Sequence, residues 1–346
     1  MEEKEFLKKL TSSFSPSGRE DYLYEEIKKV FEPYGEVSIS NINNIYVKRK
    51  GSGKNKIMIM AHLDEVALII TDFSKDGFLK FKGIGIDPKT LVSQEVIING
   101  KEDISGVIGI KPPHLMNEEE KDKAVTFQSL LIDTGLSTEK VKENISIGTF
   151  AYVKRDFTEL LNNNVACKSA DDKAGVVAMF SCAKGLEGKD LKTNVYFVLS
   201  AQEEVGHRGA KSAAYEINPD IGIAIDVTFD SGKFGADDRE NKLGAGPSVC
   251  IGPNCHVKLR KMIIETAKEC NIPYQVEVEP GNTGTDAWDI QIAREGIPTL
   301  LISIPEKYMH TSVEVIAIDD IKNTGLLLAK FIEKLDNMSL EEVLCF

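Results

Sequence analysis

The sequence lacks the long apolar run that a membrane-spanning helix needs, since nowhere do about 18 apolar residues follow one another without interruption. It also lacks an excess of positive charge, because 54 Asp and Glu outnumber 42 Lys and Arg and give a net charge of -12. Basic surfaces bind nucleic acids and anionic membranes, so we expect neither as a partner. Residues 1–5 are mostly charged and do not resemble a secretion signal. We therefore expect a cytoplasmic protein.

Cysteine is scarce, and its spacing follows no metal-binding or disulfide pattern. There is no Cys-x-x-Cys pair, which argues against a zinc knuckle and a disulfide framework. We expect the cysteines to be small buried hydrophobic residues. They are Cys167, Cys182, Cys250, Cys255, Cys270 and Cys345. The sequence also contains no Gly-x-Ser-x-Gly elbow and no P-loop.

Predicted strands and helices alternate over most of the chain, which is typical of an α/β sheet covered on both faces. The length of 346 residues and a hydrophobic content of 42% favour two domains. In an α/β sheet, ligands lie beyond the carboxyl ends of the strands. The predicted strands are 57–61, 195–200, 221–225, 274–278 and 299–304. The predicted helices are 172–185, 210–215, 257–270, 286–295 and 319–335.

One block, from about residue 67 to about residue 157, has a different pattern. Short β-type runs alternate there with Gly, Asp, Asn and Pro turns, and helical periodicity is nearly absent. This pattern predicts a small barrel or sandwich inserted into the chain. We therefore expect an α/β domain of residues 1–66 and 158–346, interrupted by a β-rich domain of residues 67–157.

Side chains that bind metals or transfer protons occur in five segments that lie far apart in the chain. Zinc and cobalt are held by imidazole and carboxylate, and a two-metal hydrolase needs both kinds of ligand from several strand ends. Most of these segments begin at or just after a predicted strand end. They are His62-Leu63-Asp64-Glu65, Asp171-Asp172-Lys173, Glu203-Glu204, Ile225-Asp226 and Met309-His310.

Each segment taken alone has a less specific explanation: an acidic first turn of a helix, a turn aspartate or a surface histidine. Their combination favours a metal centre. Asp64 lies two residues after His62, so its carboxylate is expected to accept the proton of the imidazole nitrogen that does not bind metal. Asp171 is the candidate bridging carboxylate, with Asp172 as a supporting neighbour. Glu203 and Glu204 are adjacent, so that one can bind metal while the other faces the attacking water.

Five sequence segments, spread over nearly the whole chain, together resemble the M42 family of metallopeptidases. This set is far more specific than any single motif. The only departure noted is His207, which stands where an apolar residue is expected. The segments are Ala61-His62-Leu63-Asp64-Glu65, Asp171-Asp172-Lys173-Ala174-Gly175, the nine residues from Gln202 to Ala210, Gly284-Thr285-Asp286-Ala287 and Tyr308-Met309-His310.

The resemblance implies a role for each candidate residue. His62 and Asp226 would bind one divalent metal ion, Glu204 and His310 would bind a second, and Asp171 would bridge the two. Glu203 would be the general base. The resemblance implies a β-barrel-like insert that mediates dimerisation, and dimers that assemble into a tetrahedral dodecamer. Zinc or cobalt is the expected metal, although manganese also suits imidazole and carboxylate ligands. The activity implied is an aminopeptidase acting on short peptides, and some relatives are glutamyl aminopeptidases.

The sequence leaves two alternatives to the aminopeptidase. A glycoside hydrolase, such as the endo-1,4-β-glucanase that some relatives are named as, needs only two carboxylates and gives no reason for His62 and His310. A metal-stabilised assembly protein without catalysis would need no general base. Lys233, Arg239 and Lys242 follow Asp226 in a predicted loop. Basic residues in an exposed loop are usually only solvated, and the alternative is that they attract an acidic N-terminal residue of a substrate.

Overall fold

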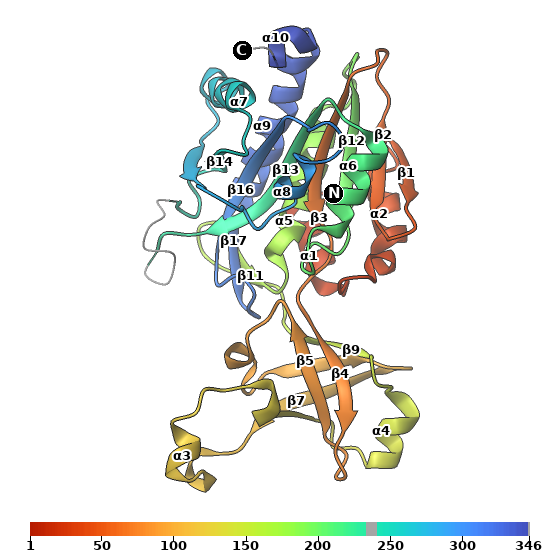
Figure 1. The fold of residues 1–346 in the computed structure, drawn as a ribbon, viewed down its shortest axis with the longest axis vertical. Helices are drawn as coiled ribbons and strands as arrows, with labels where there is room; N and C mark the ends of the chain where they lie inside the picture. The colour runs from red at the N-terminus through yellow and green to blue at the C-terminus, as the bar shows by residue number, and fades with distance from the viewer. Residues whose placement is uncertain (233–240, 345–346) are drawn as a thin grey trace. The chain divides into compact units, whose positions relative to one another are not determined.

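The computed structural model describes residues 1–232 and 241–344, which fold into two compact units (Figure 1). The larger unit contains Met1–Glu65, Phe157–Met309 and Val313–Phe346, and the smaller one contains Val66–Asp156 with His310–Ser312. The larger unit is α/β and the smaller is a closed β-barrel, so the predicted fold class is confirmed. The predicted dimerisation function of the insert stays a prediction.

The larger unit is built on one mixed sheet. Among the described residues its eleven strands follow the order β1-β2-β12-β3-β13-β16-β17-β11-β10, with β14 and β15 beside β16. The central strands β12, β3, β13 and β16 are parallel. The strands are β1 (Glu36–Ile39), β2 (Ile45–Arg49), β3 (Lys56–His62), β10 (Thr158–Glu159), β11 (Asn164–Cys167), β12 (Asn194–Ser200), β13 (Ile221–Phe229), β14 (Ser248–Ile251), β15 (Gln275–Val278), β16 (Thr299–Lys307) and β17 (Glu314–Ala317).

Helices cover both faces of this sheet. α1, α2, α5, α7 and α9 contribute to one hydrophobic cluster, and α6 and α8 contribute to the other. No helix within the described parts of the chain is long and apolar enough to cross a membrane. The helices are α1 (Glu3–Ser12), η1 (Glu20–Leu23), α2 (Tyr24–Phe31), α5 (Ala170–Gly185), α6 (Arg208–Ile217), α7 (Val257–Glu269), α8 (Ala287–Ile290), α9 (Ile318–Asp336) and α10 (Leu340–Leu344).

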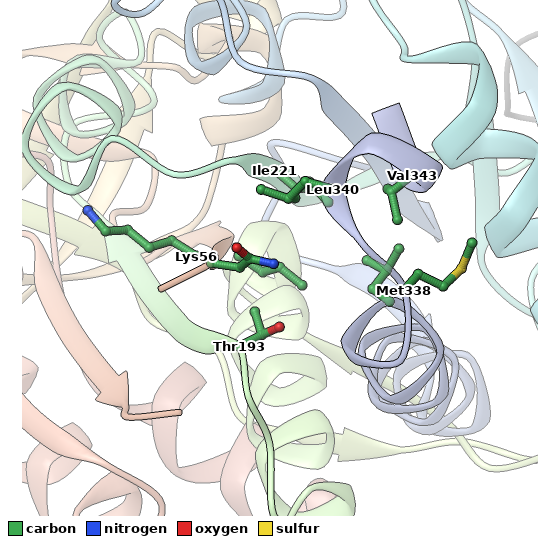
Figure 2. Close-up of a pocket in the computed structure, with 9 residues that line it drawn as sticks. Lys56, Thr193, Ile221, Met338, Leu340 and Val343 are labelled. Atoms are coloured by element: carbon green, nitrogen blue, oxygen red, sulfur yellow. The ribbon is translucent and has the colours of Figure 1, made fainter. Parts of the chain in front are cut away.

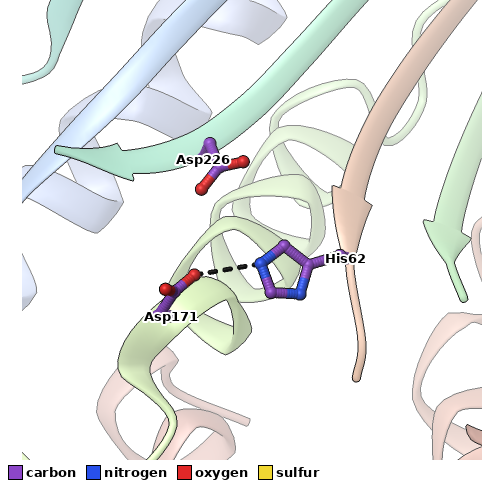
Figure 3. Close-up of side chains that lie close together, drawn as sticks. All are labelled: His62, Asp171 and Asp226. Carbon is purple, nitrogen blue, oxygen red and sulfur yellow. Dashed lines mark hydrogen bonds and ion pairs between the residues drawn. The ribbon is translucent and has the colours of Figure 1, made fainter. Parts of the chain in front are cut away.

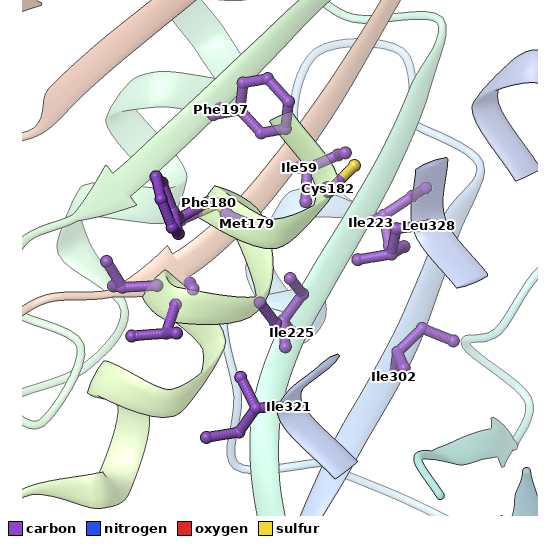
Figure 4. Close-up of a cluster of buried hydrophobic side chains, with 14 of the residues drawn as sticks. Ile59, Met179, Phe180, Cys182, Phe197, Ile223, Ile225, Ile302, Ile321 and Leu328 are labelled. Atoms are coloured by element: carbon purple, nitrogen blue, oxygen red, sulfur yellow. The ribbon is translucent and has the colours of Figure 1, made fainter. Parts of the chain in front are cut away.

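The two covered faces explain why the central strands are apolar without interruption. In β3, Ile57, Ile59 and Ala61 belong to the first cluster, and Met58 and Met60 belong to the second. Successive side chains of a strand point to opposite faces, so a strand between two helical layers needs apolar residues at every position. Figure 4 shows part of the first cluster, in which side chains of α5 and α9 pack with those of the sheet.

The smaller unit is a six-stranded antiparallel barrel with the strand order β4-β5-β8-β7-β6-β9. Alternate residues such as Leu68 and Ile70 fill its interior. Its strands are β4 (Ala67–Phe73), β5 (Leu79–Ile84), β6 (Glu95–Asn99), β7 (Asp103–Ile110), β8 (Leu130–Asp133) and β9 (Phe150–Val153). Its short helices are η2 (Pro88–Leu91), η3 (Pro113–Leu115), α3 (Glu118–Lys121), η4 (Phe127–Ser129) and α4 (Thr138–Asn144).

The structure contradicts two of the expectations about helices and cysteines. The helix predicted over 286–295 runs only from Ala287 to Ile290, and Arg294 and Gly296 adopt a positive φ that excludes them from an α-helix. Cys270 is exposed rather than buried, since it lies at the C-terminal end of α7. Cys345 lies outside the described residues. The other four cysteines are buried, as predicted.

The contact between α5 and α9 is close enough to require glycine at position 325. A Cβ atom on Gly325 would lie 2.6 Å from the carbonyl oxygen of Ala178 and would overlap the side chain of Ser181. Alanine favours a helix over glycine by roughly 1 kcal/mol, but here the overlap includes main chain that cannot move easily. We predict that Gly325→Ala lowers the free energy of unfolding by about 1–3 kcal/mol in urea denaturation.

Lys322 provides the control on the same helix, because its side chain is exposed. Lys322→Ala is expected to change the free energy of unfolding by less than about 0.5 kcal/mol. Unchanged or increased stability of Gly325→Ala would contradict the close packing of these helices.

Candidate metal centre

The carboxyl ends of the central strands bring the first candidate residues together. His62 is the last residue of β3 and pairs in register with Ser200, the last residue of β12. Met60 of β3 is paired with Ala224 of β13, so His62 and Asp226 each stand two residues beyond a matched pair. Residues two apart on a strand share a face, and both side chains therefore belong to the same side of the sheet.

Asp226 was expected at the end of its strand, but it lies inside β13. The strand continues to Phe229 because its pairing with β16 extends as far as Glu306. Asp226 is consequently buried, with 6% of its surface exposed. A buried carboxylate is costly unless it is paired or binds a cation. The buried position of Asp226 therefore indicates a bound cation more strongly than an exposed strand end would.

His62, Asp171 and Asp226 form a compact group of potential metal ligands (Figure 3). One ligand atom from each lies within 4.8 Å of the others, and all three residues are buried. Nε2 of His62 is 2.9 Å from Oδ1 of Asp171. A second group, consisting of Asp171, Glu204 and His310, also offers ligand atoms within 4.8 Å of one another. Asp171 is the member that the two groups share.

Two adjacent aspartates at the beginning of α5 make different contacts. Asp171 and Asp172 have non-helical backbone angles and are joined by a cis peptide bond. Asp172 accepts hydrogen bonds from the main-chain N–H groups of His62, at 3.3 Å, and Gly175, at 3.0 Å. The Asp172 carboxylate therefore ties the end of β3 to the first turn of α5, while Asp171 faces the ring of His62.

The carboxylate of Asp64 is not the hydrogen-bond partner of the His62 ring that the sequence predicts. Nδ1 of His62 lies 3.0 Å from the main-chain carbonyl oxygen of Asp64 but 3.6 Å from its carboxylate, so the carbonyl is the hydrogen-bond partner. The Asp64 carboxylate instead accepts hydrogen bonds from the main-chain N–H groups of Glu203, at 3.0 Å, and Glu204, at 3.2 Å. Ser17 Oγ also donates to it, at 2.6 Å. Asp64 thus fixes the two glutamates as well as the imidazole.

Glu20 supports the same loop, a role that no sequence pattern indicates. Its Oε1 accepts hydrogen bonds from the N–H groups of Gly18, at 2.8 Å, and Gln202, at 3.0 Å. Burial and the nearby charge of Asp64 raise the pKa of Glu20 to about 7. Gln202 has a φ of 57°, a left-handed conformation that the surrounding contacts must hold. Three successive main-chain N–H groups, 202 to 204, are therefore bound by buried carboxylates.

The side chain of Glu203 lies between two histidines. Oε2 is 3.9 Å from Nε2 of His62, and Oε1 is 3.1 Å from Nε2 of His207. Asp286, from the Gly-Thr-Asp-Ala segment, is also close enough for its charge to interact with that of Glu203. Burial and that charge raise the pKa of Asp286 to about 7, and Ser200 donates a hydrogen bond to it. Glu203 can therefore reach the metal-ligand group without being one of its members.

The site concentrates negative charge away from water. Burial raises the pKa of Asp226 well above its ordinary range, and the charge of Asp172 raises it further. Burial also raises the pKa of Asp172, with a further contribution from Asp171. The buried carboxylates therefore repel one another, and a divalent cation would remove that repulsion.

The donor set fits a divalent metal ion. The hydrogen bond from Nδ1 of His62 to a carbonyl oxygen leaves the lone pair of Nε2 to face Oδ1 of Asp171. Two acceptors at this distance require a proton or a cation between them. Imidazole and carboxylate together suit zinc, cobalt or manganese. The residues present are thus the ones that would hold such an ion.

A buried ion cluster lies directly beside the candidate metal ligands. Glu65 accepts from Nζ of Lys168 at 2.8 Å, from Nζ of Lys173 at 2.6 Å and from the hydroxyl of Ser169. Burial raises the pKa of Glu65, but the two ammonium groups outweigh it and lower the value to about 2. The pKa of Lys173 falls to about 8, because burial and the second ammonium outweigh the single carboxylate.

A small cavity at the opposite end of the sheet is lined by Lys56, Thr193 and Ile221 at the beginnings of the strands, and by Met338 and Val343 (Figure 2). Its volume of about 10 Å³ holds at most one water molecule.

An α/β sheet whose strand ends gather buried imidazole and carboxylates is typical of metal-dependent hydrolases. The sequence model of the family described as M42 glutamyl aminopeptidase matches residues 43–327. The chain belongs to this family and is an aminopeptidase.

Relatives of this family match the chain over nearly its whole length. Lysyl aminopeptidase from Pyrococcus furiosus is 37% identical, over 96% of this chain and 98% of the relative. An aminopeptidase structure from the archaeon Desulfurococcus kamchatkensis has a TM-score of 0.90 at 36% identity and covers 99% of this chain and 96% of its own. The Pyrococcus horikoshii TET1 peptidase, which can assemble into a tetrahedron or a large octahedral shell, has a TM-score of 0.83 at 32% identity, covering 95% and 98%.

The ion cluster of Glu65 yields a prediction about stability. Glu65→Gln leaves two buried ammonium groups without a carboxylate, and we expect the free energy of unfolding to fall by roughly 3–5 kcal/mol. The folded-state pKa of Glu65, about 2, lies below its ordinary value of 4.5. Its contribution is therefore present above pH 4.5 and is lost as the pH falls from about 4.5 to about 2. Urea denaturation at several pH values measures both effects.

The exposed pair of Asp72 and Lys80, 2.8 Å apart, provides the control. Asp72→Asn is expected to leave the free energy of unfolding nearly unchanged, because solvent screens this pair. A loss as small as this for Glu65→Gln would show that the buried cluster does not stabilise the fold.

Proposed function

We propose that the chain is a two-metal aminopeptidase that removes N-terminal residues from short peptides. The observation that carries this proposal is the position of Asp171 in both groups of potential ligands. A carboxylate shared by two such groups is what a bridging ligand requires. In this assignment His62 and Asp226 hold one ion, Glu204 and His310 hold the other, and zinc or cobalt occupies both positions.

Glu203 is the general base in this proposal. When bound, the divalent ions polarise a carbonyl oxygen and make water more acidic. The Oε2 atom of Glu203 faces the ligand group, so it is placed to take a proton from the attacking water and return it to the leaving amine. Asp64 holds the main chain of Glu203 in position. The buried carboxylates of the site offer partners for the positive α-amine of the substrate.

A preference for acidic N-terminal residues remains part of the proposal. Two of the basic residues behind it, Lys233 and Arg239, lie outside the described residues, and Lys242 is exposed. The named activity of the Pyrococcus furiosus relative is lysyl, so relatives can differ in the side chain that they accept. Glutamyl, lysyl and leucyl arylamides assayed in parallel distinguish these preferences, and a slower glutamyl reaction would remove the acidic assignment.

The alternatives explain less of the structure. A glycoside hydrolase needs two carboxylates at a set separation and has no use for the buried ring of His62 beside Asp171. Hydrolysis of an aminoacyl arylamide that stops with EDTA supports the peptidase, whereas EDTA-resistant cleavage of a β-glucan supports the glycosidase. A metal-stabilised assembly protein without catalysis predicts no hydrolysis in either assay.

The role of Glu203 leads to a direct prediction. Glu203→Gln keeps the size of the side chain but removes its basicity, so we expect kcat for the arylamide to fall by about 10²–10⁴-fold. Metal content per chain, measured by plasma emission, should not change, because Glu203 is not among the proposed ligands. The exposed Glu187 supplies the matched control, and Glu187→Gln should keep the wild-type rate. Near-full activity of Glu203→Gln would remove the general-base assignment.

Self-association forms a separate part of the proposal. The tetrahedral assembly of the Pyrococcus horikoshii relative supports a dodecamer built from dimers. Light scattering should then give a particle of about twelve times the chain mass of 38.2 kDa. A monomer at micromolar concentration would contradict the assembly, and it would leave the chemistry of the site unaffected. Cytoplasmic location likewise stays a prediction.

A further inference from the structure

His207 departs from the apolar residue expected between Gly206 and Arg208, and the structure shows where its ring lies. Nε2 is 3.1 Å from Oε1 of Glu203. Nδ1 is 2.9 Å from Oδ2 of Asp289, a buried residue of α8. Both ring nitrogens are therefore occupied by carboxylates, and only 16% of the side chain is exposed. An apolar side chain at this position could make neither contact.

The second carboxylate fixes the ring. Asp289 also lies 3.4 Å from Nζ of Lys211, one turn along α6. A chain of charges thus runs from Lys211 through Asp289 and His207 to Glu203. When both neighbouring carboxylates are ionised, they can only accept, so the ring donates from both nitrogens and is a cation. The hydrogen bond with Glu203, opposed by partial burial, raises the pKa of His207 to about 9.

The main chain restricts the same two residues. The N–H of His207 donates to the carbonyl oxygen of Glu203 at 3.0 Å, so the turn between them is closed by main-chain and side-chain contacts together. His207 has a φ of 52° and immediately precedes α6. The side chain of Glu203 is therefore held through one of its oxygens. Its other oxygen, Oε2, is left facing His62 and the ligand group.

We propose that His207, oriented by Asp289, is a positioning residue that holds the Oε1 atom of Glu203 and thereby directs Oε2 to the attacking water. This inference rests on the proposed role of Glu203 as general base. His207 itself does not touch the substrate or the metal ligands in this proposal. A charged hydrogen bond to a buried carboxylate is stronger than a neutral one, which suits it to fixing a single rotamer.

The test compares three variants of the metal-loaded protein. His207→Leu removes both contacts, His207→Gln keeps one N–H donor for Glu203, and Asp289→Asn loosens the ring. We expect His207→Leu to lower kcat by about 10- to 100-fold with KM within about threefold of wild type. His207→Gln should recover most of this loss. His207→Leu combined with Asp289→Asn should be no slower than His207→Leu alone, because the two residues act as one unit.

A structural readout separates this inference from the proposed function. In crystals of metal-free His207→Leu, the Glu203 carboxylate is expected to leave its wild-type position or to occupy several positions. Adding His207→Leu to Glu203→Gln should not slow the enzyme further. His114, exposed in the smaller unit, is the control, and His114→Leu should match wild type.

Three results would overturn the inference: a His207→Leu rate within about twofold of wild type, equal rates for His207→Gln and His207→Leu, or an unmoved Glu203 in the crystals. If His207→Leu does not fold, as judged by its melting temperature, His207→Gln and Asp289→Asn decide the question by the same measurements. An active Glu203→Gln would instead overturn the proposed function. The crystal structure would still decide whether His207 positions Glu203.

Discussion

The hydrogen bonds of Asp64 are the interaction on which the rest of the candidate centre depends. Its carboxylate is fully buried and binds the main-chain N–H groups of Glu203 and Glu204, which come from the segment after a different strand. Its carbonyl oxygen binds the ring of His62. One residue therefore fixes His62, the candidate ligand at the end of β3, and both glutamates after β12. A buried carboxylate needs hydrogen-bond donors. The loop of Glu203 and Glu204 therefore stabilises the charge of Asp64, and that charge holds the loop in place.

Negative charge is the second constraint on this site. Asp171, Asp172 and Asp226 lie buried close together, and their mutual repulsion would oppose folding if no cation were bound. Beside them, two lysines share the single carboxylate of Glu65 in a cluster that joins the end of β3 to the start of α5. The lysines balance the charge of Glu65, and we propose that divalent ions balance the charge of the three aspartates.

Much of the fold could be predicted from the sequence, because buried parallel strands are continuous apolar runs and the barrel strands alternate with clear turns. The end of β3 at His62 follows from such a run. The length of β13 does not, since its extension past Asp226 depends on pairing with β16, more than seventy residues away in the chain. The partners of Asp64 were missed for the same reason: Glu203 lies 139 residues away and Ser17 lies 47 away. Patterns within one segment indicate which side chains are polar, whereas their partners are set by tertiary structure.

We propose that Asp171 joins two metal positions. Anomalous diffraction from crystals soaked in Zn²⁺, recorded above and below the zinc absorption edge, tests this proposal. We expect two peaks per chain, one beside His62 and Asp226 and one beside Glu204 and His310, with the Asp171 carboxylate between them. Asp171→Asn should weaken both peaks. A single peak, or two peaks of which neither contacts Asp171, would show that Asp171 does not bridge two ions.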